Sequence, residues 1–245
     1  MRTLELGPLK ARVLGGPDGN GGGHGPVVVL CHGFGAPGDD LVPLSGVLGV
    51  PEEMRFVFPE APLELSLGFG ESRAWWMLDM ARLEQALATG DLRDLSNERP
   101  AGLDQARQAL FQAVAALDGA IGPGMGPPVL GGFSQGAMLA CDLALREPVP
   151  LGGLVLLSGT LLCEPEWALL MPSRRGLPVF QSHGRQDPLL PFALAARLRD
   201  RLTAAGLDVD FIDFAGGHEL PPPVLARLGR FLDRVTAESP ARGSA

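Results

Sequence analysis

The sequence predicts an α/β fold in which a mostly parallel central sheet is covered by helices on both faces. Short apolar runs alternate with amphipathic stretches, the runs are nearly continuous in Val and Leu, and 46% of the 245 residues are hydrophobic. Strands buried on both faces have this continuous pattern, and parallel strands need long connections that are usually helices. A chain of this length and composition can fill one large core, so we expect a single domain over residues 1–245.

The expected strands are short runs rich in Val, Leu and Phe that are bounded by Gly, Pro or charged residues. They lie at residues 9–14, 27–31, 55–58, 129–133, 153–158, 178–183 and 209–214. Four amphipathic stretches among the later strands predict helices. These helices cover residues 103–121, 135–146, 191–205 and 222–236. The alternation of strand and helix is typical of a parallel sheet.

One segment interrupts this alternation. It contains Trp75 and Trp76, a helical stretch at residues 78–89 and a polar stretch at residues 91–100. An insertion of this kind often covers or shapes an active site, and a plain surface excursion is the alternative. We therefore predict a lid-like insertion at about residues 61–100 in an otherwise regular fold.

Charge and cysteine content limit the partners and the compartment. The formal net charge is −8, so we expect neither nucleic acid nor an anionic membrane surface as a partner. The chain has no apolar stretch long enough to span a bilayer and starts without the apolar segment of a secretory signal. We expect a cytoplasmic protein without integral membrane contact, in which Cys31, Cys141 and Cys163 are buried, reduced thiols.

A nucleophile motif follows the expected strand at residues 129–133. Ser134 is at the centre of the run Gly-Phe-Ser-Gln-Gly at residues 132–136, directly before an Ala- and Leu-rich helical pattern. This strand–turn–helix context is the one that the G-x-S-x-G nucleophile elbow requires. The strained turn exposes the serine hydroxyl, and glycines on either side avoid collisions with the neighbouring strand and helix. We predict that Ser134 is a nucleophile; a chance match in a chain with 34 glycines is the alternative.

Chain order selects the base and the acid that orients it. A serine nucleophile needs a base, and in enzymes with this elbow the order is Ser, then Asp or Glu, then His. Of four histidines, only His218 has both Ser134 and a suitable acid upstream, and it lies in the loop after the expected strand at residues 209–214. Asp187 is that acid, because the competing carboxylates lie on a strand, at its start or directly beside His218.

The expected oxyanion hole begins with an apolar strand that opens into a glycine-containing loop. Residues 27–35, Val-Val-Val-Leu-Cys-His-Gly-Phe-Gly, can turn backbone N–H groups toward a developing negative charge. We predict the N–H groups of Phe34 and Gln135 as donors, since Gln135 begins the helix after the nucleophile. His32 is expected to hold the loop. A phosphate-binding loop is disfavoured because no Gly-Lys-Ser/Thr sequence follows.

Together these motifs resemble the phospholipase/carboxylesterase family of α/β-hydrolases, which includes acyl-protein thioesterases and bacterial carboxylesterases. The resemblance covers essentially the whole chain. It rests on Leu-Cys-His-Gly-Phe-Gly at 30–35, Phe-Pro-Glu-Ala-Pro at 58–62, Arg-Ala-Trp-Trp at 73–76, Gly-Phe-Ser-Gln-Gly-Ala at 132–137, His-Gly-Arg-Gln-Asp at 183–187 and Gly-His-Glu at 217–219. It implies an α/β-hydrolase fold and hydrolysis of carboxylic esters or thioesters by Ser134, His218 and Asp187, without a cofactor or a metal.

The sequence predicts the substrate only by class. Family members often carry Trp-Phe-Asp or Trp-Tyr-Asp where this chain has Trp-Trp-Met-Leu-Asp at residues 75–79, a difference that concerns substrate choice. We select Trp75, Trp76 and Leu161 as substrate contacts, although apolar residues of this kind are more often part of the core.

Short- to medium-chain esters are the first choice of substrate, because no large charged cluster indicates an ionic one. Lysophospholipids or acyl-protein thioesters come next. A peptidase or amidase is an alternative within enzymes, and a non-catalytic protein that binds a hydrophobic ligand or a partner is an alternative of another class. Apolar helical faces also leave a homodimer open.

Overall fold

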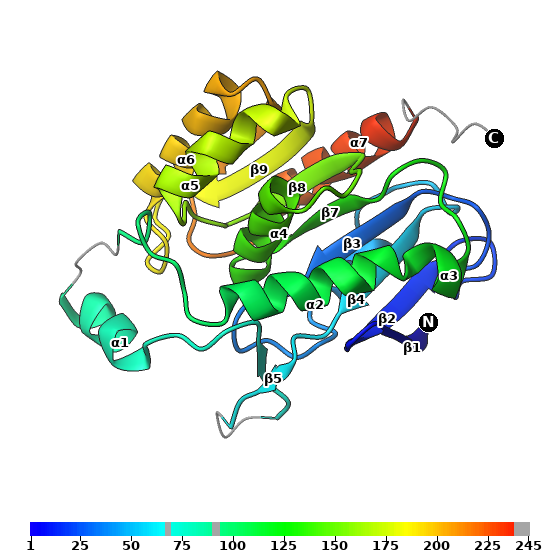
Figure 1. The fold of residues 1–245 in the computed structure, drawn as a ribbon, viewed down its shortest axis with the longest axis horizontal. Helices are drawn as coiled ribbons and strands as arrows, with labels where there is room; N and C mark the ends of the chain where they lie inside the picture. The colour runs from blue at the N-terminus through cyan, green and yellow to red at the C-terminus, as the bar shows by residue number, and fades with distance from the viewer. Residues whose placement is uncertain (67–69, 90–93, 238–245) are drawn as a thin grey trace.

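An eight-stranded sheet with the order β1-β2-β4-β3-β7-β8-β9-β10 runs through the protein (Figure 1). The structure is a computed structural model that describes residues 1–66, 70–89 and 94–237. The strands of this sheet are β1 (Arg2–Leu6), β2 (Leu9–Gly15), β3 (Val27–Cys31), β4 (Arg55–Pro59), β7 (Val129–Phe133), β8 (Gly153–Leu157), β9 (Pro178–Gly184) and β10 (Asp208–Phe214). The pairs from β4 to β10 are parallel, whereas β1 and β2 pair antiparallel with each other and β2 with β4.

The edge strand β1 is not predicted from the sequence. Its residues alternate between polar and apolar, and only Leu6 is buried, so the continuous apolar pattern of the inner strands is missing. Gly7, with a φ of 58°, forms the turn that lets β1 fold back and pair Leu6 with Leu9.

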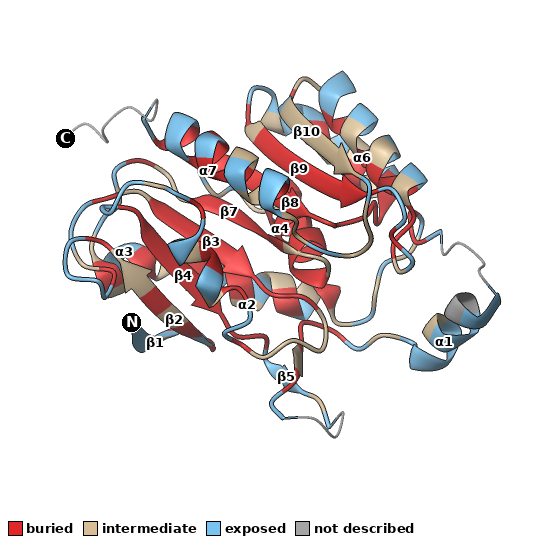
Figure 2. Cartoon of the chain, turned by 180° about the vertical axis from the view of Figure 1, so that it is seen from behind, coloured by how far each residue is buried: buried red, intermediate tan, exposed pale blue. Residues whose placement is uncertain are grey.

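Helices cover both faces of the sheet, as expected (Figures 1 and 2). One face carries α2 (Leu103–Ala115), α3 (Leu117–Ile121), α4 (Gln135–Arg146), α5 (Glu164–Leu170), the short 3-10 helix η2 (Met171–Arg174) and α6 (Phe192–Ala204). The other face carries the 3-10 helix η1 (Val42–Gly46) and α7 (Pro222–Ala237). Alternate residues of β3 explain its continuous apolar run, since Val29 packs toward α2 and α4 while Val28 and Leu30 pack toward α7.

The helical pattern differs from the prediction at two points. The stretch at residues 103–121 divides at Ala116 into α2 and α3, and α5 is an additional short helix. The helix α5 begins after Cys163, whose φ of 45° is unusual for a residue with a side chain. With seven residues, α5 is too short to show a clear helical period.

The described part of the segment at residues 61–100 contributes no strand to the main sheet. It contains the antiparallel pair β5 (Leu63–Glu64) and β6 (Arg73–Ala74), followed by α1 (Met80–Thr89). Both views show α1 projecting from the body of the protein (Figures 1 and 2). Residues 67–69 and 90–93 of the expected insertion lie outside the described residues.

The three cysteines are buried and form no disulfide, as predicted. Burial raises the pKa of the Cys31 and Cys141 thiols, so both stay protonated at neutral pH. In the part of the chain that the structure describes, no helix combines the length and the hydropathy needed to cross a membrane.

Candidate active site

Ser134 lies between β7 and α4, where the chain turns sharply. Its φ of 54° and ψ of −116° are rarely adopted by residues with a side chain, and its N–H donates to the carbonyl of Leu157 at 2.8 Å. A Cβ atom at Gly136 would lie 2.1 Å from the carbonyl oxygen of Cys31, and one at Gly132 would lie 2.4 Å from it. Glycine at both positions therefore lets α4 approach β3, which places Ser134 at the carboxyl edge of the sheet.

A histidine–carboxylate pair lies at the same edge of the sheet. Asp187 follows β9 and His218 follows β10, and these two strands are parallel neighbours. His218 Nδ1 lies 2.7 Å from Asp187 Oδ2. The other oxygen of Asp187, Oδ1, accepts hydrogen bonds from the N–H groups of Leu189 and Leu190, both at 2.9 Å.

These contacts fix the protonation of Asp187. Burial opposes its ionisation, but the hydrogen bonds from His218 and from the two N–H groups outweigh burial, and the pKa of the carboxyl lies below its usual value. An ionised Asp187 accepts the Nδ1 proton of His218, so the opposite nitrogen, Nε2, is free to act as a base.

A second histidine, His183, packs behind this pair. Its Nε2 lies 2.8 Å from the carbonyl oxygen of Leu190 and 3.4 Å from Asp187 Oδ2. Burial lowers the pKa of His183, so the ring is neutral and its Nε2–H donates to Leu190. The turn from Asp187 to Leu190 is thus held from both sides. Nothing in the sequence shows how deeply His183 is buried, and this contact was not predicted.

The loop after β3 is held in place by His32. Its ring Nδ1 lies 2.8 Å from the carbonyl oxygen of Gly33, and its Nε2 accepts a hydrogen bond from the N–H of Ala61 at 3.0 Å. Because Nε2 accepts, the ring proton is on Nδ1, and burial lowers the pKa of His32 in keeping with a neutral ring. The N–H of Gly35 donates to the carbonyl of Arg73 at 2.8 Å, which joins the loop to β6.

The side chain of Gln135 joins the start of α4 to the segment after β6. Its Oε1 accepts from the N–H of Trp75 at 2.9 Å, and its Nε2 donates to the carbonyl of Trp76 at 2.8 Å. The indole of Trp75 in turn donates to the carbonyl of His32 at 2.9 Å. Buried hydrogen bonds therefore connect the three segments that surround Ser134.

Four of the five residues expected to act in catalysis share one cavity of about 180 Å³: Phe34, Ser134, Gln135 and His218. The rest of its wall is mostly apolar: Gly33, Ala36, Asp40, Leu78, Leu83, Leu95, Phe133, Met138, Leu189 and Leu190. Within the described residues, the backbone N–H groups of Phe34 and Gln135 donate to no other protein group. The two residues that carry these unpaired donors therefore line the same cavity as the serine and the histidine. We call it the active-site cavity.

A second cavity of about 250 Å³ adjoins the active-site cavity, and Leu78, Leu95 and Met138 line both. Of the three residues predicted to contact substrate, Trp76 lines the second cavity. Trp75 and Leu161 line neither of the two and belong to the hydrophobic core, with 2% and 0% of their surface exposed.

The sheet and the position of this site at its carboxyl edge define the class of the protein. A mostly parallel sheet with helices on both faces and a serine on the sharp turn after a central strand is the α/β-hydrolase fold.

Comparison with known proteins gives the family. Residues 20–236 match the family model described as Phospholipase/Carboxylesterase, and the chain belongs to this family. Acyl-protein thioesterase 1 of Emericella nidulans is 30% identical over 223 residues, which cover 86% of this chain and 91% of that protein. A probable carboxylesterase of Oryza sativa subsp. japonica is 29% identical over 208 residues, 81% of this chain and 83% of that protein.

A solved structure agrees with this assignment. The crystal structure of esterase PE8 is 28% identical in sequence and superposes with a TM-score of 0.77, over 93% of this chain and 99% of that chain. Membership of the family supports hydrolase activity on esters or thioesters.

Proposed function

We propose that this protein is a serine carboxylesterase that hydrolyses esters of short to medium acyl chains through an acyl-enzyme intermediate. One observation carries the proposal. His218, whose Nδ1 lies 2.7 Å from Asp187 Oδ2, lines the same apolar cavity as Ser134 and as Phe34 and Gln135, whose backbone N–H groups are unpaired. A nucleophile, a base with its orienting acid and two donors for a negative oxygen are the parts that acyl transfer needs.

The reaction begins when Ser134 Oγ attacks the carbonyl carbon of the ester and His218 Nε2 takes the hydroxyl proton. Asp187 stabilises the imidazolium that results. The negative charge moves to the carbonyl oxygen, where the N–H groups of Phe34 and Gln135 bind it.

The acyl-enzyme forms when the bond from the carbonyl carbon to the leaving oxygen breaks and His218 gives its proton to the departing alcohol. Water then attacks the acyl group, with His218 as base again. The second tetrahedral intermediate collapses, the carboxylic acid leaves, and Ser134 regains its proton.

The size of the active-site cavity favours short to medium chains. Its volume of about 180 Å³ is below the roughly 300–1,000 Å³ of pockets that enclose drug-sized ligands. Apolar side chains dominate its wall, so acyl groups gain affinity there by leaving water. Leu83 of α1 belongs to this wall, and we propose on that ground that residues 61–100 act as a lid.

An acyl-protein thioesterase or a lysophospholipase is the second candidate. The second cavity supports this candidate. It has a volume of about 250 Å³ and lies beyond Leu78, Leu95 and Met138, which line both cavities, so together the two cavities would admit a longer acyl chain. The relative from Emericella nidulans, which is named acyl-protein thioesterase 1, also supports this candidate.

A ladder of p-nitrophenyl esters from acetyl to palmitoyl tests the proposal, with kcat/KM measured for the wild type and for Ser134→Ala. We expect a maximum at short or medium chains and a loss of about a millionfold in kcat in the variant. A maximum at palmitoyl would favour the second candidate. No turnover by the folded wild type would contradict the proposal and favour a non-catalytic binding protein.

Ser158→Ala is the matched control for this experiment. Ser158 also has a positive φ, of 47°, and lies at the end of the neighbouring strand β8, but it lines neither of the two cavities. The variant should retain the wild-type ladder, which separates loss of the nucleophile from disturbance of a strained serine.

A further inference from the structure

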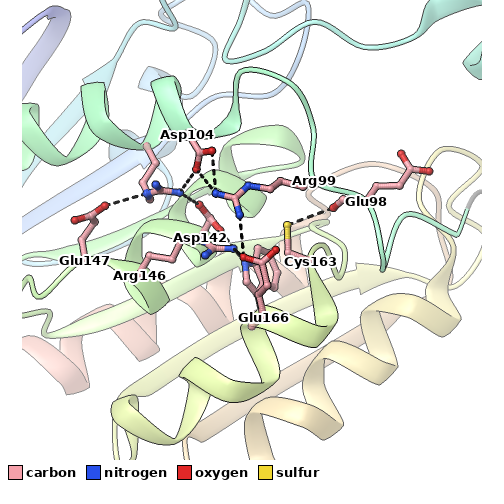
Figure 3. Close-up of polar contacts among 10 residues, drawn as sticks. Glu98, Arg99, Asp104, Asp142, Arg146, Glu147, Cys163 and Glu166 are labelled. Carbon is pink, nitrogen blue, oxygen red and sulfur yellow. Dashed lines mark hydrogen bonds and ion pairs between the residues drawn. The ribbon is translucent and has the colours of Figure 1, made fainter.

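Ten residues outside the proposed mechanism form a polar network beside the second cavity (Figure 3). Its centre is Asp142 of α4, whose side chain is fully buried. Oδ1 accepts from the indole N–H of Trp167 at 2.8 Å and from Arg146 Nε at 2.7 Å, and Oδ2 accepts from Arg107 Nη1 at 2.8 Å. A buried carboxylate destabilises the fold strongly when it loses its charged partners, so the surroundings of Asp142 must keep both arginines in place.

The ion pairs close into a ring in which negative and positive side chains alternate. In order around the ring they are Asp142, Arg146, Glu166, Arg99, Asp104 and Arg107. We call these six residues the charge ring. The pairs that do not involve Asp142 are 2.7–2.9 Å long. The ring connects α2, α4 and α5, and Arg99 is its one member outside a helix (Figure 3).

Arg99 belongs to a short segment that is also held through its backbone. The carbonyl of Glu98 accepts from the N–H of Cys163 at 3.2 Å and from its Sγ at 3.3 Å. The carbonyl of Ser96 accepts from the N–H of Glu164 at 2.7 Å. Cys163 has a strained φ of 45°. Such a backbone conformation persists only where the surrounding structure fixes it.

The same segment supplies part of the wall between the two cavities. Leu95 is 7% exposed and lines both the active-site cavity and the second cavity, as does Met138. Met138 and Asp142 are four residues apart on α4, so they lie on one side of the helix. The ring therefore links the helix that carries Met138 to the segment that carries Leu95.

We propose that the charge ring fixes Leu95 relative to Met138 and thereby limits the length of acyl chain that the active-site cavity accepts. Glu166 is then a positioning residue for chain-length selection, which acts through Leu95 and lines neither cavity. Arg99 positions Leu95 in the same way and in addition lines the second cavity. The inference rests on the proposed esterase function. Opening the ring at either residue removes one of the links that hold the segment, so Leu95 can move away from Met138 and longer acyl chains reach the second cavity.

The test compares kcat/KM of p-nitrophenyl acetate, butyrate and decanoate for the wild type, Arg99→Met and Glu166→Gln. The two side chains are 44% and 45% exposed, so each substitution opens the ring at its surface and spares the buried Asp142. We expect the acetate value to stay within twofold of wild type. The ratio of decanoate to butyrate should rise at least about fourfold, the contribution of one additional methylene buried against apolar surface.

Two further variants make the result specific. Arg227→Met removes an arginine of similar exposure, 41%, that pairs with Asp210 on the other face of the sheet, and it should leave the ratio unchanged. Leu95→Ala removes the wall itself and should raise the ratio in the same direction as Arg99→Met.

Because Arg99 also lines the second cavity, Glu166→Gln decides the inference. An unchanged ratio in Glu166→Gln, or an equal loss at every chain length, would overturn the inference alone. Absence of Ser134-dependent turnover in the wild type would overturn the proposed function and the inference with it.

Discussion

Replacing Gln135 by methionine removes two buried hydrogen bonds while it keeps a side chain of similar length. In the native protein the amide of Gln135 accepts from the N–H of Trp75 at 2.9 Å and donates to the carbonyl of Trp76 at 2.8 Å. Methionine can replace neither bond, and both backbone groups stay buried without a partner.

The expected cost follows from these two groups. A buried donor or acceptor that loses its partner costs about 1–3 kcal/mol, so the loss of two partners should lower the free energy of unfolding by about 2–6 kcal/mol. For a chain of this size each kcal/mol corresponds to roughly 2–4 °C, which gives a decrease in Tm of at least about 4 °C. The proposed oxyanion donor is the backbone N–H of the same residue and is retained, so kcat should fall by less than the roughly hundredfold loss expected for a missing donor.

Urea denaturation followed by circular dichroism measures this cost, and Gln181→Met is the matched control. Gln181 is equally buried, but its side chain makes one hydrogen bond, to the carbonyl of Ala195 at 2.8 Å, and its Oε1 has no partner. The control should lose less, because it removes one hydrogen bond where Gln135→Met removes two, and it also removes a buried oxygen that has no partner. If Gln135→Met costs no more than Gln181→Met, the link between α4 and the segment after β6 does not stabilise the fold as described.

Three further predictions concern other parts of the fold. The free energy of unfolding should fall as the pH drops below about 6.5, because His183 is neutral in the folded protein while the same residue in the unfolded chain takes up a proton. In urea titrations, His183→Gln should reduce the slope of this free energy against pH by up to about 1.4 kcal/mol per pH unit. An unchanged slope would contradict the neutral state of His183. Gly136→Ala should prevent soluble expression or abolish activity, because its Cβ would lie 2.1 Å from a carbonyl oxygen of β3, whereas Gly46→Ala meets no atom within 4 Å and should behave as wild type. Trp167→Phe removes the indole hydrogen bond to Asp142 and should lower stability by about 1.5–3 kcal/mol, and a smaller change in thermal denaturation would show that the arginines alone satisfy the carboxylate.

The inner strands of the sheet were predictable because burial on both faces makes their sequences continuously apolar. In β3 every residue is buried, whereas β1 buries only Leu6 and has no such run. The division of the helical stretch at Ala116 and the short helix after Cys163 depend on backbone conformations that no residue type there requires.

The proposed catalytic residues could be selected because a local motif and chain order identify them. Ser134 lies in a strand–turn–helix motif, and His218 and Asp187 follow it in the order that such motifs require. The cavity wall could not be derived in this way, because Leu83 and Leu95 come from the irregular segment and meet Met138 only in the folded chain. The sequence likewise does not distinguish an apolar residue of the cavity wall from one of the core, and only the folded chain shows that Trp75 and Leu161 belong to the core.

One feature of the sequence indicates the charge ring. Asp142 stands within the Ala- and Leu-rich stretch that forms α4, where every neighbour from residue 135 to 145 is buried. A carboxylate at such a position needs charged partners, so a buried ion network was predictable in kind. Its partners were not, because Arg107 and Trp167 belong to other helices.

The most direct test of the central claim is the reaction of the protein with a fluorophosphonate, followed by mass spectrometry of the intact chain and its peptides. If His218 activates Ser134, the wild type should gain one adduct, located on Ser134, and both Ser134→Ala and His218→Gln should gain none under the same conditions. An adduct on another residue, or equal labelling of His218→Gln, would contradict the account.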